Sequence, residues 1–203
     1  MKNEKGAVLT SSAHRLGGMR RPLPFALLVL SGVILDQLAK VLIFRWIQVN
    51  ESVPLWDGVF RITAVYNPGV AFSLFKDYPW LVLAFACIAV PALAYWYART
   101  WRHAPAALVW SQGLLLAGAT GNLLDRIRPP YMVRDFIEFV PRVPWVGKWG
   151  IFNVADICIC VGVGFYLLAE LRGSSARKEE VVESPSENKT TSHHGDTETR
   201  RKD

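Results

Sequence analysis

Ionisable and amide side chains stand inside long apolar segments of this chain, where a charge is costly. A charged residue at the centre of a membrane span costs about 2.5–3.5 kcal/mol on insertion scales, so each one calls for a role. The residues are Asp36 and Lys40 in the first segment, Asn122, Asp125 and Arg126 at the end of the third, and Asn153 and Asp156 at the start of the fourth. If the segments cross a bilayer in alternating directions, all of these residues fall in one leaflet.

Acid–base chemistry is what such a cluster suits best. Two carboxyl groups close together cannot both ionise easily, so they share a proton; one then acts as a base on water and the other as an acid toward a carbonyl. Asp156 lies in the cluster, and the residues alone leave Asp125 and Asp36 as candidates for its partner. Asp135 alternates with apolar residues in the stretch 133–137, and from this alternation alone we expect its side chain to be exposed.

Spacing leaves two interpretations open for two of the pairs. Asp36 and Lys40 are four residues apart and share a helix face. They suit either an ion pair whose charges snorkel to the interface or a role in holding substrate. Asn153 and Asp156 are three residues apart, so Asn153 is either the N-cap of the fourth helix, a hydrogen-bonding member of the site, or both.

Metal and disulfide chemistry is not expected. The four histidines lie in tails or a short loop, and the sequence contains no HExxH motif and no ligand set for zinc. Cys87, Cys158 and Cys160 all fall inside apolar segments, and the last two point to different helix faces. We therefore expect no metal and no cofactor, and we interpret the cysteines as packing residues.

Four segments are long enough to cross a bilayer, which takes about 20 apolar residues. They cover residues 23–44, 80–97, 104–124 and 151–171 of a 203-residue chain that is 51% hydrophobic. Backbone groups in lipid are satisfied only in helices or closed barrels, and these segments are too long for barrel strands. The sequence predicts an all-α membrane protein with four transmembrane helices. The first segment exceeds the apolar core of a signal peptide, and we interpret it as an anchor.

Charge bias sets the expected orientation. The N-terminal tail, residues 1–22, holds five Lys or Arg and one acid, and the turn after the second segment adds Arg99 and Arg102. The positive-inside rule therefore places both termini in the cytoplasm. The segment between the third and fourth helices also holds five Lys or Arg, which is unusual for an outer loop and opposes this orientation. Residues 172–203 are polar and lack aromatics, so we expect a disordered cytoplasmic tail.

The loop between the first two segments carries a strand pattern. Apolar residues alternate at Phe60, Ile62, Ala64 and Tyr66, among β-branched and aromatic neighbours. The turn residues 67–69 then end the pattern. We expect a small β-sheet on the membrane surface.

Four sequence blocks group the polar residues of this chain into short motifs. They are Asp36-Gln-Leu-Ala-Lys40, Asn67-Pro-Gly-Val-Ala-Phe72, Gly121-Asn-Leu-Leu-Asp-Arg126 leading to Val133-Arg-Asp-Phe-Ile137, and Phe152-Asn-Val-Ala-Asp156. These blocks, in this order, resemble those of bacterial lipoprotein signal peptidase, the signal peptidase II family of aspartyl peptidases. The resemblance covers residues 23–171. One block alone would be weak, whereas four in order are highly specific.

The resemblance implies the catalytic pair that spacing left open. The acids of the family's dyad map to Asp135 and Asp156, which overturns the exposed position inferred for Asp135, and Asp125 then becomes structural. Other matching positions line the dyad and the substrate backbone or form the polar pair of the first helix. They are Asn67, Gly69, Asn122, Arg126 and Asn153, and Asp36 with Lys40.

The resemblance also implies the fold, the substrate and the location. The fold is four transmembrane helices with a small extracytoplasmic β-cradle and a surface helix. The substrate is a diacylglyceryl-modified prolipoprotein, cut before the lipidated cysteine to release the signal peptide without a cofactor. We expect a monomer in the bacterial inner membrane with its active site at the outer face. Its partners are prolipoproteins and membrane lipid, and we expect no nucleic acid.

Two positions depart from the family's pattern. Arg134 stands where the family usually has an aliphatic residue, and alternation predicts that its side chain points away from Asp135 with little effect on the chemistry. Pro129-Pro130-Tyr131 replaces a glycine that often precedes this block, which alters the path of the loop.

Two other classes of function fit the sequence less well. A proton-coupled transporter needs polar residues through the whole membrane depth, and the inner halves of the segments are apolar apart from Ser111 and Gln112. A serine–lysine peptidase needs a serine beside Lys40, and Ser73 is the candidate.

Overall fold

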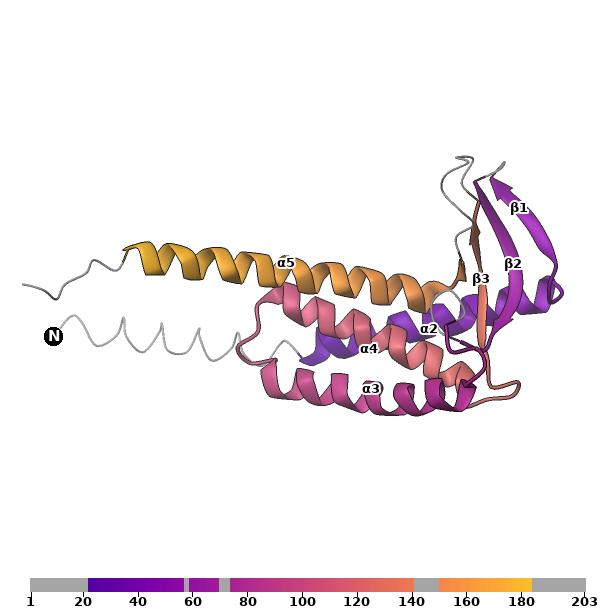
Figure 1. The fold of residues 1–203 in the computed structure, drawn as a ribbon, viewed down its shortest axis with the longest axis horizontal. Coiled ribbons are helices and arrows are strands. Elements are labelled where there is room, and N and C mark those ends of the chain that lie inside the picture. Colours follow the sequence, from indigo (N-terminus) through magenta and orange to yellow (C-terminus); the bar gives the residue numbers. More distant parts are fainter. Residues whose placement is uncertain (1–21, 57–58, 70–73, 141–149, 184–203) are drawn as a thin grey trace, which may run out of the picture. The chain divides into compact units, whose positions relative to one another are not determined.

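The helices of the chain agree with the four predicted spans. The computed structural model describes residues 22–183 apart from 57–58, 70–73 and 141–149 (Figure 1). Within these residues, four helices are long and apolar enough to cross a membrane. They are α2 (Pro22–Trp46), α3 (Pro79–Thr100), α4 (Ala106–Arg126) and α5 (Val154–Glu183).

Helix α5 differs from its predicted segment at both ends. It starts three residues later than expected because Ile151–Phe152 form a short strand and Asn153 caps the helix. It continues to Glu183, past residue 172, where we expected a disordered tail to begin. Residues 176–180 are all good helix formers, which favours this extension. The rest of the predicted C-terminal tail, residues 184–203, and residues 1–21 lie outside the described residues.

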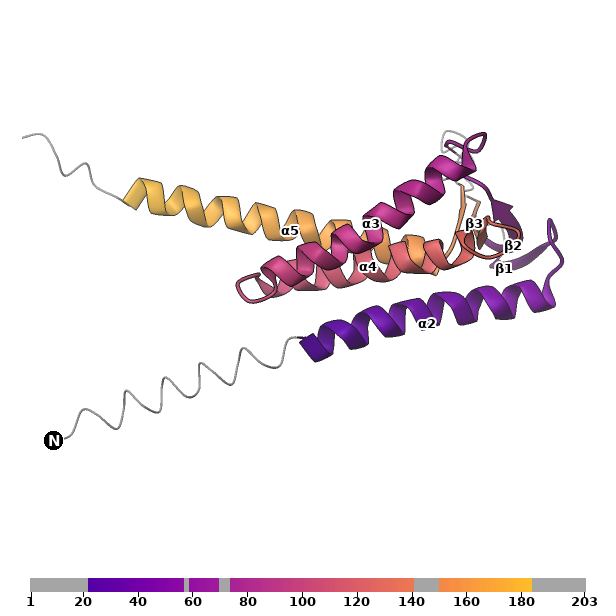
Figure 2. The same ribbon diagram turned by 90° about the horizontal axis from the view of Figure 1, so that it is seen from below.

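Helix α4 is the most buried of the four spans and packs against α2 and α3 (Figure 2). Glycines allow close approach between helices in a membrane. A Cβ at Gly121 would lie 2.6 Å from Oδ2 of Asp36 in α2, and a Cβ at Gly118 would meet the carbonyl oxygen of Ala155 at the start of α5. These glycines therefore let the helices that carry the polar residues approach at backbone distance.

Four antiparallel strands form one sheet in the order β1-β2-β3-β4. Their bounds are β1 Ser52–Trp56, β2 Phe60–Asn67, β3 Val133–Phe139 and β4 Ile151–Phe152. Strand β2 confirms the predicted strand, but its alternation is interrupted. A register shift between Ile62 and Val65 lets the neighbours Thr63 and Ala64 both be buried.

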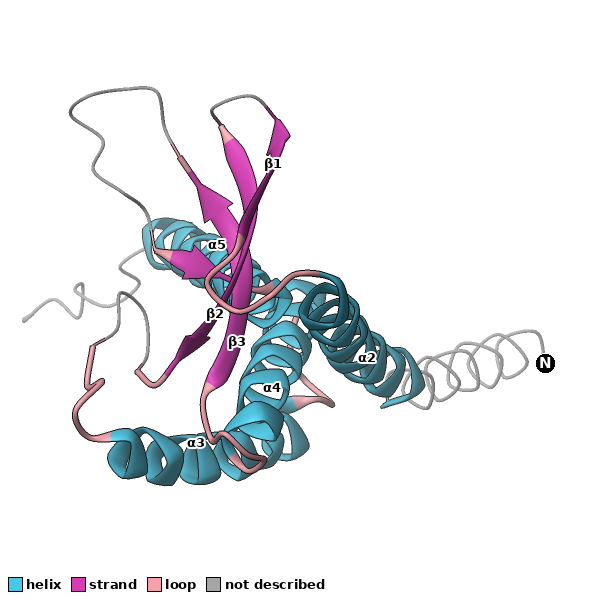
Figure 3. Cartoon of the chain, turned by 90° about the vertical axis from the view of Figure 1, so that its right-hand side faces the viewer, coloured by secondary structure: helices cyan, strands magenta, loops and turns pink. Residues whose placement is uncertain are grey.

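The sheet lies beside the ends of α2 and α4 and the start of α5 (Figures 1 and 3). Strand β3 follows α4 after a short turn, and β4 leads directly into α5. This connectivity brings Asp135 of β3 next to the last turn of α4 and the first turn of α5. The small sheet that we expected is confirmed, whereas the surface helix has no counterpart among the described residues.

Candidate active site

The polar residues that were predicted to converge do so at the end of the helices that adjoins the sheet. Asn122 of α4 accepts a hydrogen bond from Lys40 of α2 (3.1 Å) and one from Asn153 before α5 (3.1 Å). Asn153 also donates to Asp135 of β3 (2.6 Å). This network or its immediate partners include Asp36, Lys40, Asn67, Gly69, Asn122, Arg126, Asp135, Asn153 and Asp156. The structure thus brings together all of the predicted site residues.

Asp135 and Asp156 are held by three asparagines. The Oδ1 of Asp135 accepts from Nδ2 of Asn153 (2.6 Å), and its Oδ2 accepts from Nδ2 of Asn67 (2.9 Å). The Oδ1 of Asp156 accepts from Nδ2 of Asn122 (2.8 Å), and its Oδ2 accepts from the backbone N–H of Asn153 (3.1 Å). Because all four donors are neutral amides, they orient the carboxyl groups without neutralising their charge.

Asn153 has both of the roles that its spacing allowed. Its Oδ1 accepts from the backbone N–H of Asp156 (3.0 Å), while Oδ2 of Asp156 accepts from the backbone N–H of Asn153, a reciprocal capping arrangement. Its Nδ2 donates to Asp135. The residue that caps α5 therefore also joins the two carboxyl groups through its hydrogen bonds.

Asp135 is buried, with 2% of its surface exposed, so the expectation from alternation alone was wrong. Strand β3 turns Arg134 to one face and Asp135 to the other, where Asn67 and Asn153 cover it. Burial and then the charge of Asp156 raise the pKa of Asp135 to about 7, against the lowering effect of the two amide donors. A carboxyl group that keeps its proton near neutral pH can serve as a general acid.

Lys40 is fully buried and has three acceptors. Its Nζ lies 2.8 Å from Oδ2 of Asp36 and 3.0 Å from Oδ2 of Asp125, and it donates to Asn122. The other oxygen of Asp36 accepts from the backbone N–H of Ala155 in the first turn of α5 (2.9 Å). The snorkelling ion pair is therefore wrong, because α4 and α5 enclose both charges. Neither side chain has exposed surface that could contact a substrate. The pair instead holds Asn122 and the first turn of α5 in place.

Arg126 fastens the loop after β2 to α4. Its Nη2 donates to the carbonyl oxygen of Gly69 (2.8 Å), and its Nη1 donates to that of Asn122 (3.2 Å). The N–H of Gly69 donates to Oδ1 of Asn67 (2.9 Å), whose amide holds one carboxyl group of the site. The turn predicted at 67–69 thus positions a donor. Ser73, the serine considered for a serine–lysine mechanism, lies outside the described residues.

Gln37 is a member of the network that was not singled out from the sequence. Its Nε2 donates to the carbonyl oxygen of Gly121 (3.1 Å) and lies 3.4 Å from Oδ1 of Asp125, and its Oε1 accepts from Arg134 (3.0 Å). The signal was available, because a polar residue directly follows Asp36 in an otherwise apolar segment. Asp125 bonds to Lys40, Gln37 and Arg134, which agrees with the structural role inferred for it.

Proton transfer is the chemistry that this arrangement offers. A buried carboxyl group with a raised pKa stands beside a second carboxyl group, and both are oriented by amides. In the part of the chain that the structure describes, no three His, Cys, Asp or Glu side chains are grouped to hold a metal ion. The carboxyl pair is the feature to which a reaction can be assigned.

Comparison with known proteins points to one family. The family model described as signal peptidase (SPase) II matches residues 28–172. The chain is 37% identical over 154 residues to the lipoprotein signal peptidase of Geobacter sulfurreducens, covering 73% of this chain and 91% of that protein. It is 39% identical over 144 residues to that of Syntrophotalea carbinolica, covering 69% and 86%.

Two solved structures of bacterial membrane enzymes share the fold. One has a TM-score of 0.68 at 25% identity and covers 82% of this chain and 94% of its own. The other has a TM-score of 0.63 at 26% identity and covers 73% and 92%. The residues matched by the family model include the whole carboxyl network. The chain therefore belongs to the signal peptidase II family, membrane aspartyl endopeptidases that remove the signal peptide from diacylglyceryl-modified prolipoproteins.

Proposed function

We propose that Asp135 and Asp156 are the two catalytic acids of this enzyme and that they activate a water molecule for attack on the scissile carbonyl. The observation that carries the proposal is that both carboxyl groups bind to one residue, Asn153, through its side-chain amide and its backbone N–H. Asn67 and Asn122 bind the remaining carboxylate oxygens. Neutral donors leave the pair able to share one proton, as the reaction requires.

In the proposed reaction the pair starts with one proton. The ionised carboxyl group takes a proton from water, the water oxygen bonds to the scissile carbonyl carbon, and the protonated carboxyl group gives its proton to the carbonyl oxygen. When the tetrahedral intermediate collapses, the carbon–nitrogen bond breaks. The leaving amine takes a proton from one carboxyl group while a hydroxyl of the intermediate returns one to the other. The pair again holds one proton and is ready for the next substrate.

The rate of cleavage is expected to fall as the pH rises above about 7. The pKa of Asp135 is raised to about 7, so the pair keeps its shared proton below this pH and loses it as the pH rises through it. Cleavage of a prolipoprotein in detergent micelles should decline roughly tenfold per pH unit on the basic side, with a midpoint within about one unit of pH 7. A rate that keeps rising toward pH 10, as a lysine base predicts, would contradict the carboxyl pair.

Lys40 is a poor candidate for the base of a serine–lysine mechanism. All three hydrogens of its ammonium face acceptors, two of them carboxylates. The side chain of Lys40 is fully buried within these contacts, so no position around its nitrogen is left for a serine hydroxyl. These contacts support a structural role for Lys40.

We further propose that the catalytic end of the spans lies at the outer face of the inner membrane and that both termini are cytoplasmic. The four candidate spans among the described residues place both termini on one side, and the basic N-terminal tail favours the cytoplasm. Two of the basic residues that opposed this orientation are engaged inside the protein. Arg126 binds backbone carbonyls and Arg134 pairs with Asp125. A single chain supplies every group of the site described above, which supports a monomer as the working enzyme.

A single cysteine in β1, Leu55→Cys, is expected to react with a membrane-impermeant maleimide on intact spheroplasts, because Leu55 is exposed beside the proposed outer face. The matched control is Arg102→Cys in the turn between α3 and α4, which should react only after lysis. Both are made after replacing Cys87, Cys158 and Cys160 by alanine. The reverse pattern of labelling would invert the proposed orientation.

A further inference from the structure

We propose that Arg134 is a positioning residue that fastens strand β3 to helix α4 and so sets where Asp135 stands relative to Asp156. The proposal rests on the assignment of these two acids as the catalytic pair. The resemblance described in the sequence analysis implies an aliphatic residue at this position, whereas this chain has Arg134. The proposal differs from the expectation that Arg134 has little effect on the chemistry.

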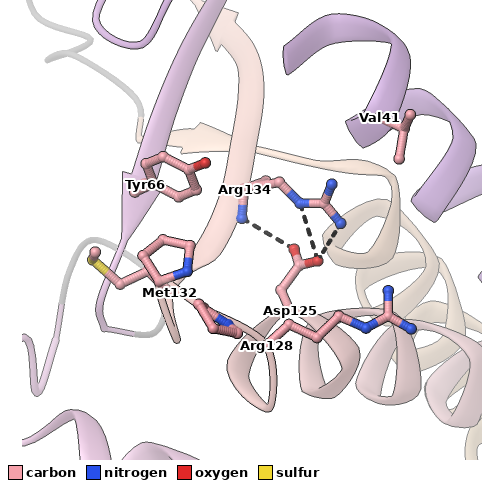
Figure 4. Close-up of a pocket in the computed structure, with 8 residues that line it drawn as sticks. Val41, Tyr66, Asp125, Arg128, Met132 and Arg134 are labelled. Atoms are coloured by element: carbon pink, nitrogen blue, oxygen red, sulfur yellow. Dashed lines mark hydrogen bonds and ion pairs between the residues drawn. The ribbon is translucent and has the colours of Figure 1, made fainter. Parts of the chain in front are cut away.

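Arg134 makes three bonds to the carboxylate of Asp125 (Figure 4). Its Nη2 lies 2.6 Å and its Nε 3.2 Å from Oδ1, and its backbone N–H donates to Oδ2 (3.1 Å). Its Nη2 also donates to Oε1 of Gln37 in α2 (3.0 Å). Arg134 binds the carboxylate of Asp125 with both its backbone and its side chain. These bonds fix the position of β3 and its rotation about its own axis at the residue directly before Asp135.

Asp125, the residue to which Arg134 binds, is itself held by a second ion pair. Oδ2 of Asp125 lies 3.0 Å from the ammonium of Lys40, which also pairs with Asp36. Without Arg134, the buried carboxylates of Asp36 and Asp125 would both pair with Lys40 alone. With Arg134, each carboxylate has a cation to balance its charge. The side chain of Arg134 is only 18% exposed, and enclosed ion pairs with several hydrogen bonds couple their partners more strongly than surface pairs do.

Helix α4 carries both the anchor for Arg134 and a direct contact to the second acid. Asn122, three residues before Asp125, donates to Oδ1 of Asp156 (2.8 Å). Arg134 and Asp135 point to opposite faces of β3, so Arg134 acts on the pair through the strand and not by contact. The last turns of α4 therefore position both acids. Asp125 holds the strand of Asp135 through Arg134, and Asn122 binds Asp156 directly.

Arg134→Val, which introduces the kind of residue usual in the family, is expected to lower kcat for prolipoprotein cleavage about tenfold with KM changed less than about twofold. A small displacement of one acid affects the chemical step and leaves substrate contacts in place. Arg134→Lys should recover part of the loss, since an ammonium can pair with Asp125 but lacks the forked geometry. In an Asp125→Asn background, Arg134→Val should cost less than in the wild type, because its anchor is already weakened.

Arg128→Val is the matched control. Arg128 lines the same cavity of about 180 Å³ as Arg134 and carries the same charge. Its backbone N–H donates to the carbonyl oxygen of Asp125, a bond that the substitution keeps, but none of the bonds drawn to the Asp125 carboxylate comes from Arg128 (Figure 4). We expect its kcat to stay within about twofold of the wild type. Each cleavage rate is divided by the concentration of folded enzyme. The folded fraction is determined from the thermal unfolding curve in detergent micelles.

Four results would overturn the positioning role: wild-type kcat in Arg134→Val, a rise in KM alone, an equal loss in Arg128→Val, or a loss fully explained by unfolding. Failure of the catalytic assignment gives a different result, namely cleavage by an enzyme in which Asp135 is replaced by asparagine. The two proposals are therefore tested separately.

Discussion

Asp135→Asn and Asp156→Asn are each expected to slow prolipoprotein cleavage at least about a thousandfold while the protein remains folded. Asparagine has nearly the same shape, and its amide oxygen can still accept a hydrogen bond from Asn153. Its NH2 group cannot accept the second hydrogen bond, and the side chain cannot take up or release the shared proton. In the proposed reaction the two acids act as one unit, so the double variant should be no slower than either single variant. The measurement is release of the signal peptide from a diacylglyceryl-modified prolipoprotein in detergent micelles.

The stability of the Asp135→Asn variant gives an independent check that inactivity is not unfolding. The pKa of Asp135 is raised in the folded protein, so this group makes the wild type lose stability as the pH rises from about 4 to about 7, and the variant lacks this contribution. Between about pH 5 and about pH 8 the unfolding temperature of the variant should therefore fall less than that of the wild type. Asp77→Asn, the same change at an exposed position, should leave cleavage unaltered. Cleavage by Asp135→Asn at more than about a tenth of the wild-type rate would remove Asp135 from the catalytic pair.

Lys40→Met is expected to lower the free energy of unfolding by about 3–5 kcal/mol, the usual cost of removing one partner of a buried ion pair. After the substitution, the buried carboxylate of Asp36 has lost its ion pair with Lys40, and that of Asp125 keeps its ion pair with Arg134. Adding Asp36→Asn should restore much of the loss, because the buried charges then balance again. The measurement is denaturant or thermal unfolding in detergent micelles.

Lys76→Met is the control for Lys40→Met. Lys76 is exposed, and its replacement should change stability by less than about 0.5 kcal/mol. If Lys40→Met were as stable as the wild type, or if the double variant were less stable than Lys40→Met alone, the charge balance inferred for this cluster would be wrong.

The four spans, the strand at 60–67 and the convergence of polar residues could all be predicted from the sequence, because each depends on local properties. Span length follows from bilayer thickness, and alternating directions of the helices put Asp36, Asn122 and Asp156 at the same end. The identity of the second acid could not be predicted in this way. Alternation indicates that Asp135 and Arg134 face opposite sides of a strand. It does not indicate which of the two sides is buried under other parts of the chain.

The cover over Asp135 comes from residues that are distant in sequence. Asn67 lies 68 positions before Asp135 and Asn153 lies 18 after it, and only the folded sheet brings them to the same carboxyl group. The same limit explains the wrong interpretation of Lys40. Spacing of four residues reveals its partner Asp36 within one helix, but the second partner, Asp125, is supplied by another helix.

The ion pair between Asp36 and Lys40 has a consequence for the biogenesis of the enzyme. Helix α2 is synthesised before α4 and α5, so at its insertion neither Asp125 nor the N–H of Ala155 exists to bind these side chains. Their spacing lets the two charges neutralise each other within α2, at 2.8 Å, which reduces the insertion cost of about 2.5–3.5 kcal/mol per charge. When the later helices arrive, Lys40 gains Asp125 and Asp36 gains the first turn of α5. The same pair therefore first permits the entry of one helix into the bilayer and afterwards provides the docking point for two others.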